Sequence, residues 1–210
     1  MAENAARVVT LYEGTGHRPW DDEAPVPAPL ALHATPVKPE WVDYNGHMSE
    51  SCYLLVFGDN SDAFFRYLGI DEEYRANGGS LYTVETHLHN KREVAEGEPL
   101  RLTLRLLDHD AKRVHVFHEM WHAADGTLLA TAEQMLLHVD TAEGRACPLP
   151  DALLHRLGAI QSAHDALDMP ESAGRPMGIP ADRSRRTAAA ARHAGSPDDA
   201  GPRTAGPRTS

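Results

Sequence analysis

Hydrophobic residues recur along this chain with two different periods, and the two periods separate one long helix from a series of strands. In residues 49–68 the large apolar side chains follow helical spacing, with Ser49 in the N-cap position and Gly69 as the stop. We therefore predict a long helix that is buried around most of its circumference. A shorter helix is predicted over residues 151–167.

Apolar and polar residues alternate with a period of two after the long helix. The runs are residues 81–91, 100–108, 113–122 and 128–139. This alternation is typical of a sheet with one buried face. Short turn sequences separate the last three runs, so we expect them to form an antiparallel meander. Residues 30–42 are predicted to be extended and interrupted by prolines.

One buried helix followed by an antiparallel sheet predicts an α+β fold in which the sheet curls around the helix, the hot-dog arrangement. A sheet of this kind leaves one edge strand unpaired and the helix incompletely covered. A second copy of the chain would complete both, so we expect a homodimer or a homotetramer.

Composition divides the chain into three parts. Residues 1–29 are expected to be an extension and linker, with a short strand at 8–12, and residues 30–167 the folded domain. Residues 168–210 are expected to be a disordered basic tail. From residue 171 onward there are seven arginines and no aromatic residue, too little apolar surface to offset the entropy of ordering.

The net charge excludes one class of function and leaves others open. The chain carries 20 basic and 31 acidic residues, a formal charge of -11, which repels a phosphate backbone and argues against nucleic acid as partner. No apolar run reaches the roughly 20 residues needed to cross a bilayer, and no signal peptide is evident, so we expect no membrane association and a cytoplasmic location. The two cysteines, Cys52 and Cys147, are too far apart to indicate a disulfide framework or a cysteine zinc site.

Candidate chemistry concentrates where the extended segment meets the long helix. Asp43 precedes Gly46, and the helix begins a few residues later. The amides of Met48, Ser49 and Glu50 at a helix start lack intrahelical partners and suit a carbonyl oxygen that gains negative charge. Gly46 would let a substrate approach the backbone. Asp43 would then attack an acyl carbon directly or draw a proton from water.

The same residues carry a resemblance to a known family. Asp43-x-x-Gly46-His47-Met48 followed by Tyr53 resembles the D-x-x-G-H-V-N-x-x-x-Y signature of hot-dog acyl-CoA thioesterases of the 4-hydroxybenzoyl-CoA thioesterase type. The resemblance implies that Asp43 is catalytic, that Gly46 and His47 form the turn before the helix, and that Tyr53 faces the pocket. It implies hydrolysis of an acyl-CoA with no cofactor beyond the coenzyme A of the substrate.

Several alternatives remain open at this motif. Asp43 and Asn45 are also good turn formers, which is a sufficient reason for their presence before a glycine. His47 is expected either to assist the carboxylate and orient substrate or to cap local backbone. Ser49 stands where the family commonly has asparagine, so a side-chain amide is missing there.

A narrower likeness concerns the substrate. The strings PEWVDYNGHM, FGDNSDAFFRYLGID, GGSLYTVETHLHN and LLATAEQMLLHVD resemble betainyl-CoA thioesterases of carnitine breakdown, which also occur fused to carnitine dehydrogenase. This implies conversion of betainyl-CoA to betaine and coenzyme A, with that dehydrogenase as a possible partner.

A betainyl group carries a quaternary ammonium, which only aromatic faces and negative charge can hold. The candidates for this role are Trp41, Tyr44, Tyr82, Trp121, Glu50 and Glu85. Aromatic residues on strands also serve as core, which is the simpler interpretation for each of the four. The candidates for the phosphates of coenzyme A are Lys91, Arg92, Lys112 and Arg113.

A second motif suggests a different enzyme. His118-Glu119-Met120-Trp121-His122 reads as H-E-x-x-H, the signature of zinc peptidases when it lies on a helix. Its context predicts a strand, which would separate the two histidines by about 13 Å. His87 and His89 form an H-x-H pair without a third ligand, so no metal is expected. The alternatives are therefore a zinc-dependent peptidase using His118 and His122, or a non-catalytic hot-dog module that binds an acyl thioester or a partner.

Overall fold

The computed structural model describes residues 18–178 of the 210-residue chain. The expected strand at residues 8–12 and most of the expected basic tail lie outside the described residues. A first compact unit extends to Gly174, and every element described below belongs to it.

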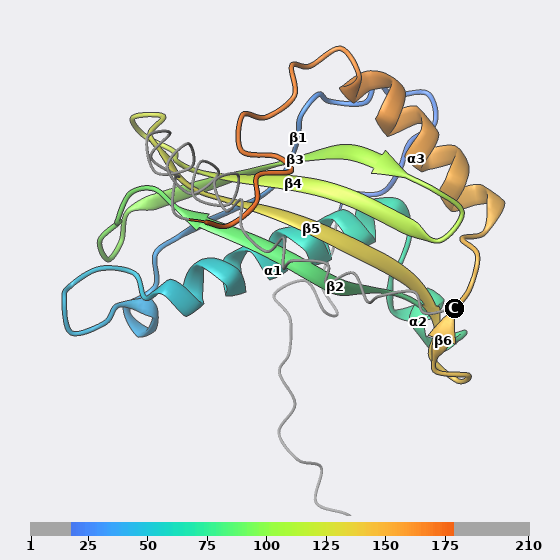
Figure 1. Ribbon diagram of the computed structural model, residues 1–210, viewed down its shortest axis with the longest axis horizontal. Coiled ribbons are helices and arrows are strands. Elements are labelled where there is room, and N and C mark those ends of the chain that lie inside the picture. Colours follow the sequence, from blue (N-terminus) through green and yellow to red (C-terminus); the bar gives the residue numbers. More distant parts are fainter. Residues whose placement is uncertain (1–17, 179–210) are drawn as a thin grey trace, which may run out of the picture. The chain divides into compact units, whose positions relative to one another are not determined.

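One antiparallel sheet, with strands of unequal length, and one long helix make up most of this unit (Figure 1). The strands are β1 (Leu30–Pro36), β2 (Gly79–Asn90), β3 (Pro99–His109), β4 (Arg113–His122), β5 (Leu128–Asp140) and β6 (Arg145–Ala146). The helices are α1 (Glu50–Leu68), α2 (Glu72–Ala76) and α3 (Asp151–His164), with a 3-10 turn at Pro39–Trp41.

The strand order is β1-β3-β4-β5-β2, and β6 pairs with β5. The order confirms the predicted meander of β3, β4 and β5. It also brings β2, which comes first after the helix, to the edge beside β5. Helix α1 packs against β1, β2, β3 and β5, so the sheet curls around it, and the predicted α+β hot-dog arrangement is confirmed.

Helix α1 begins and ends where its sequence predicts. Ser49 occupies the N-cap with extended backbone, although its side chain makes no capping hydrogen bond. Gly69 ends the helix with φ of 91°, a left-handed conformation that glycine adopts without a Cβ penalty. The second half of the helix is buried on nearly all sides, whereas Leu54 and Leu55 in the first half stay exposed.

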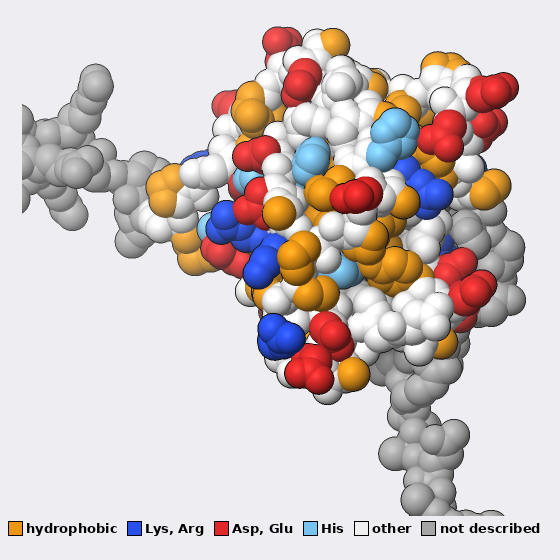
Figure 2. Space-filling view, turned by 90° about the vertical axis from the view of Figure 1, so that its right-hand side faces the viewer, with side chains coloured by type: hydrophobic (Ala, Val, Ile, Leu, Met, Phe, Trp, Pro, Cys, Tyr) orange, Lys and Arg blue, Asp and Glu red, His pale blue; other side chains and the backbone are white. Residues whose placement is uncertain are grey.

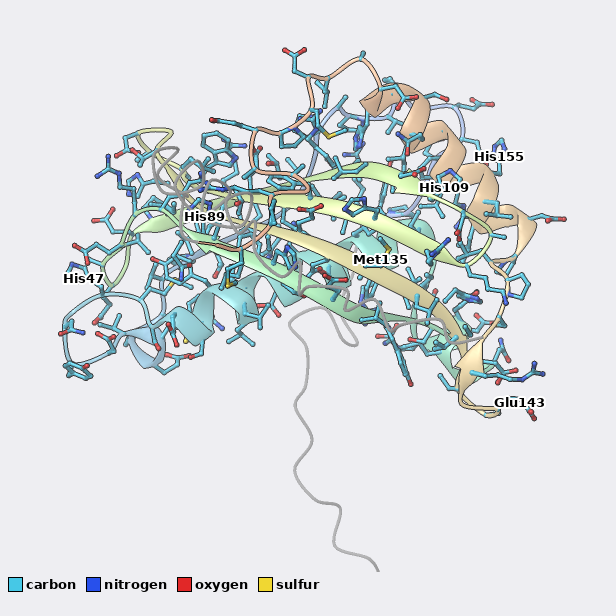
Figure 3. All side chains as sticks on the ribbon, viewed as in Figure 1. His47, His89, His109, Met135, Glu143 and His155 are labelled. Carbon is cyan, nitrogen blue, oxygen red and sulfur yellow. The ribbon has the colours of Figure 1, made fainter. Side chains whose placement is uncertain are left out.

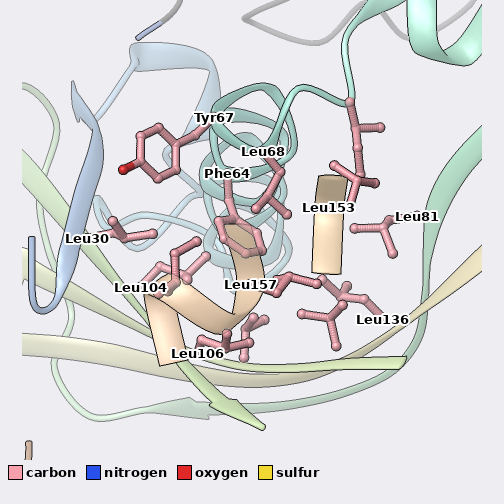
Figure 4. Packing of buried hydrophobic residues seen from close by; sticks show 14 of the residues in the cluster. Leu30, Phe64, Tyr67, Leu68, Leu81, Leu104, Leu106, Leu136, Leu153 and Leu157 are labelled. Atoms are coloured by element: carbon pink, nitrogen blue, oxygen red, sulfur yellow. The ribbon is translucent and has the colours of Figure 1, made fainter. Parts of the chain in front are cut away.

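Two hydrophobic clusters fill the space between α1 and the sheet. One joins the end of α1 to α3 and to the near ends of the strands, with Phe64, Leu68 and Leu157 among its fully buried members (Figure 4). The other surrounds the start of α1 and includes Tyr53 and Phe57. This second cluster forms the support beneath the predicted motif.

A small polar group lies in the interior beside these clusters. Asn60 Nδ2 is 2.9 Å from His118 Nδ1, and Ser61 donates to Gln134 Oε1 at 2.9 Å. All four side chains are almost fully buried. These hydrogen bonds join α1 to β4 and β5. Because hydrogen bonds are directional, they fix the position of the helix along the sheet more strictly than apolar contacts do.

The sequence prediction was incomplete at the ends of the domain. The expected extended segment 30–42 is divided into β1 and the 3-10 turn, because the two prolines at positions 36 and 39 interrupt the ladder. The last helix ends at His164, three residues before the predicted end. Helix α2 and strand β6 were not predicted, since each is too short to show a period.

The surface shows no segregation of charge on the face drawn in Figure 2. Asp and Glu side chains lie there among Lys, Arg, His and apolar side chains, in the part of the chain that is coloured. No helix among residues 18–178 is long and apolar enough to cross a membrane.

Candidate active site

A tight turn between the 3-10 segment and α1 holds Asp43 in place. The Asp43 amide donates to the His47 carbonyl at 3.0 Å, and the Gly46 amide donates to the Asp43 carbonyl at 3.0 Å. Gly46 has φ of 81°, which only glycine adopts readily. One carboxylate oxygen of Asp43 accepts from the Asn45 amide at 2.8 Å. Asp43 is therefore a turn former, and its second oxygen has no partner in the described part of the chain.

A cavity of about 520 Å³ opens beside this turn. It is formed by the turn, the first residues of α1 and the segment that follows β2. The lining residues are Asp43, Asn45, His47, Met48, Glu50, Tyr53, Asn90, Lys91, Arg92 and Glu93. Figure 3 shows His47 at the end of the molecule where these three segments meet. The structure thus brings most of the predicted motif into one cavity.

Two of the predicted oxyanion donors are already engaged. The Met48 amide donates to the Val94 carbonyl at 2.9 Å, and the Ser49 amide donates to the Trp41 carbonyl at 2.8 Å. The segment before α1 forms short β-bridges on both sides, and these bridges use its amides. Met48 and Ser49 are therefore not free to bind a carbonyl oxygen.

The free donors lie slightly further along, at the first turn of the helix. Glu50 and Ser51 are the first two residues of α1, and neither amide has an acceptor among residues 18–178. The positive end of the helix dipole lies behind them. Of the three amides named from the sequence, only that of Glu50 is free, and Glu50 also lines the cavity, so it is the candidate donor for a carbonyl oxygen there.

Tyr53 and His47 contribute polar atoms to the cavity wall. Tyr53 is 3% exposed, and its hydroxyl donates to the Arg92 carbonyl at 3.2 Å. Burial raises the pKa of Tyr53, and the nearby Glu93 carboxylate raises it further. The Val94 backbone lowers this pKa, but its effect is smaller than either of the other two. Tyr53 is therefore a neutral hydrogen-bond donor. His47 Nδ1 lies 3.3 Å from a carboxylate oxygen of Glu93.

The four predicted phosphate-binding cations are divided between two regions. Lys91 and Arg92 line the cavity, and both of their amides donate to the Leu129 carbonyl, at 2.9 and 3.0 Å. Arg113 instead forms an ion pair with Asp110 at the β3–β4 turn. The Arg113 bond is the main reason why the pKa of Asp110 falls to about 2. Lys91 and Arg92 line this cavity, whereas Lys112 and Arg113 do not.

The predicted aromatic cage is not assembled within one chain. Tyr82 and Glu85 stand opposite Leu137 and Met135, on the face of the sheet away from α1. Leu136 between them points into the core, so strand alternation places its neighbours outside. These two predicted ligands therefore do not line the cavity at the start of α1.

The remaining cage residues have other surroundings. Trp121 follows the core residue Met120 and its indole donates to Thr103 at 3.3 Å, again on the outer face. Trp41 is 6% exposed and packs in the second hydrophobic cluster. Tyr44 is 97% exposed at the tip of the turn and does not line the cavity. Tyr53 is the one aromatic residue that does line it.

The zinc-peptidase motif lies on a strand, as its context predicted. His118 on β4 is fully buried against Asn60, and burial lowers its pKa to about 4. His122 lies at the end of β4 and pairs with Glu98 and Asp125. Among residues 18–178, no group of three or more His, Cys, Asp or Glu side chains is arranged to hold a metal. The geometry does not favour the peptidase alternative.

Sequence reasoning missed two residues of the cavity, Asn90 and Glu93. Asn90 is the last residue of β2 and Glu93 follows the strand, and no motif marks either residue. The only local signal was the polar run from position 90 to 93, which ends an alternating strand.

Comparisons with known proteins agree with this architecture. The model of a family described as the thioesterase-like superfamily matches residues 37–157. An L-carnitine dehydrogenase/betainyl-CoA thioesterase from a Rhizobium species is 49% identical over 150 residues, which make up 71% of this chain and 30% of that relative. The chain therefore spans less than a third of this two-function relative.

Two further proteins match nearly along their full length. The betainyl-CoA thioesterase of Pseudomonas aeruginosa is 45% identical over 152 residues, covering 72% of this chain and 96% of that relative. The protein SAV2348 from Staphylococcus aureus, solved in complex with CoA, superimposes with a TM-score of 0.68 at 26% identity, covering 75% of this chain and 100% of that one.

Proposed function

Because the chain belongs to the thioesterase-like superfamily, we propose that it hydrolyses acyl-CoA thioesters, with betainyl-CoA as the preferred substrate and betaine and coenzyme A as products. The single observation that carries the proposal is the cavity at the start of α1. There Asp43, with one carboxylate oxygen that has no partner among residues 18–178, and Glu50, whose helix amide is free, line the same space, and the free Ser51 amide follows in the same helical turn. This combination suits acyl transfer from a thioester.

The geometry assigns roles to three parts of the cavity. The thioester oxygen binds at the Glu50 and Ser51 amides, which stabilise the negative charge that develops when the carbonyl carbon becomes tetrahedral. The free oxygen of Asp43 either attacks that carbon or aligns and activates the attacking water. The C–S bond then breaks and coenzyme A leaves. Hydrolysis needs no cofactor, since coenzyme A enters as part of the substrate.

The charges around the cavity match both ends of the proposed substrate. Asp43 and Glu50 give the space near the reacting carbon a negative character, which favours a quaternary ammonium beside the Tyr53 ring. Lys91 and Arg92 lie on the same wall and would bind the phosphates of coenzyme A. The name of the Pseudomonas aeruginosa relative supports the same substrate.

We propose that the active form is a homo-oligomer built on the β2 edge. Strand β2 pairs only with β5 among the described strands, so its other side presents free backbone groups. Four large apolar side chains are exposed on these elements: Tyr82 and Val84 on β2, and Leu54 and Leu55 in the first half of α1. A second copy pairing edge to edge would cover these side chains and give a dimer, two of which would give a tetramer.

Carnitine dehydrogenase is a proposed partner. The Rhizobium relative carries both names in one chain, and this chain covers 30% of that relative. Association is checked by mixing the purified protein with a carnitine dehydrogenase and measuring a mass shift by light scattering. An unchanged mass would reject a stable complex.

A thiol-release assay with a panel of acyl-CoAs tests the activity. Betainyl-CoA should give the largest kcat/KM, a neutral short acyl-CoA a lower one, and an aromatic acyl-CoA the lowest. The neutral isostere of betainyl-CoA, with a tert-butyl group in place of trimethylammonium, is the matched control for charge. Equal rates for the two would contradict cation recognition, and no release from any substrate would favour the non-catalytic module.

A further inference from the structure

Glu93 connects the two cavities at this end of the molecule. The first is the 520 Å³ cavity of the proposed site, and the second measures about 430 Å³. His47, Arg92 and Glu93 line both. The imidazole of His47 therefore lies on the wall between two spaces that a substrate can enter, and Glu93 is its carboxylate neighbour at 3.3 Å.

The backbone on either side of Glu93 is held firmly. The Arg92 amide donates to Leu129 at 3.0 Å, and the Val94 carbonyl accepts from the Met48 amide at 2.9 Å. The Met48 bond ties this segment directly to the catalytic turn. Although the Glu93 side chain is 74% exposed, its carboxylate projects from a fixed point beside His47.

The pairing has a consequence for the protons of the imidazole. The contact has the distance of an ion pair and is not one of the hydrogen bonds of the structure, so it acts through charge: the negative carboxylate 3.3 Å away favours a proton on Nδ1, the nitrogen nearest to it. In neutral His47 this places the proton on Nδ1 and leaves the lone pair on Nε2. No partner for Nε2 exists among residues 18–178, so Nε2 is available to accept a proton.

We infer that Glu93 is a positioning residue, which holds His47 in the tautomer with Nδ1 protonated and thereby makes Nε2 the acceptor for a proton of the attacking water. This inference rests on the proposed function. As the water oxygen bonds to the acyl carbon, its proton passes to Nε2. The C–S bond then breaks with its electron pair on sulfur, and the coenzyme A thiolate takes the proton from Nε2.

This assignment also narrows the role of Asp43. With His47 as the base for water, Asp43 either aligns the water in the step above or attacks first; in the second case the C–S bond breaks as an acyl-Asp43 anhydride forms, and His47 takes the proton of the water that cleaves this anhydride. A single turnover in water labelled with ¹⁸O distinguishes these two, because only attack by Asp43 leaves the label in the carboxylate of the protein.

A merely structural ion pair would behave differently. Exposed ion pairs contribute about 0–1 kcal/mol to stability, so removing the Glu93 charge should leave the fold unchanged. The test therefore joins the tautomer of His47 to turnover, because a structural pair can set the tautomer but does not change kcat.

The experiment compares the full chain with Glu93→Gln, Glu93→Asp and Glu96→Gln. Glu96 lies in the same segment, is exposed and lines neither cavity, so Glu96→Gln controls for the loss of one charge. Imidazole ¹⁵N shifts, assigned with a His47→Gln variant, should report Nδ1 protonation in the parent chain and in Glu96→Gln. Glu93→Gln should shift the population toward Nε2 protonation, and Glu93→Asp should restore part of the original tautomer.

Turnover provides the second measurement. With betainyl-CoA, Glu93→Gln should lower kcat about tenfold at unchanged KM, whereas Glu96→Gln should keep the parent rate. An unchanged tautomer in Glu93→Gln, or an unchanged kcat, overturns the inference. If the parent chain releases no coenzyme A, the proposed function fails, and the ¹⁵N measurement still shows whether Glu93 sets the tautomer.

Discussion

Asp43 uses its two carboxylate oxygens for different purposes. One accepts the Asn45 amide and closes the turn, while the other borders the cavity without a partner. The turn-forming and catalytic interpretations of this residue are therefore compatible. An asparagine at position 43 keeps one oxygen that can accept the Asn45 amide but carries no charge. Asp43→Asn therefore separates the turn-forming role from the catalytic role.

We predict that Asp43→Asn lowers kcat for betainyl-CoA by about 10² or more with little change in stability. Asp43→Ala should lose the activity and also about 1 kcal/mol, because the Asn45 amide loses its acceptor. Thiol release and urea unfolding measure the two effects. Substantial activity in Asp43→Asn would show that its charge is not used in the reaction.

At the scale of elements, the start of α1 depends on the segments around it. The bridges that fix the turn at Asp43 use the Met48 and Ser49 amides, and the amides of Glu50 and Ser51 in the first helical turn remain free among residues 18–178. The position of an oxyanion site is thus decided by which amides the neighbouring strands leave free. Sequence alone showed that a helix starts there but not which amides would be taken.

The exposed edge of β2 leads to a prediction about assembly. Val84 lies at a bulge of this strand and is 56% exposed. Val84→Lys places a charge at the proposed interface and should convert the oligomer to monomer. Ser162→Lys on the exposed side of α3 is the control for added charge.

Light scattering after size-exclusion chromatography measures the mass of each variant. The parent chain and Ser162→Lys should elute as the same oligomer, and Val84→Lys as a monomer. An unchanged mass for Val84→Lys would place the interface elsewhere, and a monomeric parent chain would reject the oligomer.

At the scale of the whole molecule, buried histidines link stability to pH. Burial lowers the pKa of His118 to about 4, from an ordinary value of 6.5, and lowers that of His33 to about 4 as well. The unfolded chain therefore binds more protons than the folded chain between these values. The resulting stability is fully present above pH 6.5 and is lost as the pH falls toward 4.

We predict that the free energy of unfolding declines between pH 7 and pH 4, with about 3 kcal/mol of the loss attributable to His118. His118→Gln cannot titrate, so it should be less stable at pH 7 but lose less on acidification. Urea unfolding at several pH values measures this slope. His33 should preserve part of the pH dependence in His118→Gln. An identical pH slope in the parent chain and in His118→Gln would refute the assignment to His118.

The sequence by itself determined the long helix, the meander and the turn before the helix. These features follow from local physics: the period of apolar residues, the Gly69 stop and the Asp43–Asn45–Gly46 turn are all contained in a few neighbouring residues. The same locality explains why the strand context of His118 correctly opposed the zinc motif.

Only the tertiary structure decided which side chains meet. Tyr82 and Glu85 fell on the outer face because a strand points alternate residues to opposite sides, and the bulge between Thr83 and Glu85 shifts that alternation in a way no local pattern reveals. Glu93 joined His47 because the segment after β2 folds back onto the turn, 46 residues earlier in the chain. Contacts between residues so far apart in the chain depend on strand order and register, and no short stretch of sequence determines these.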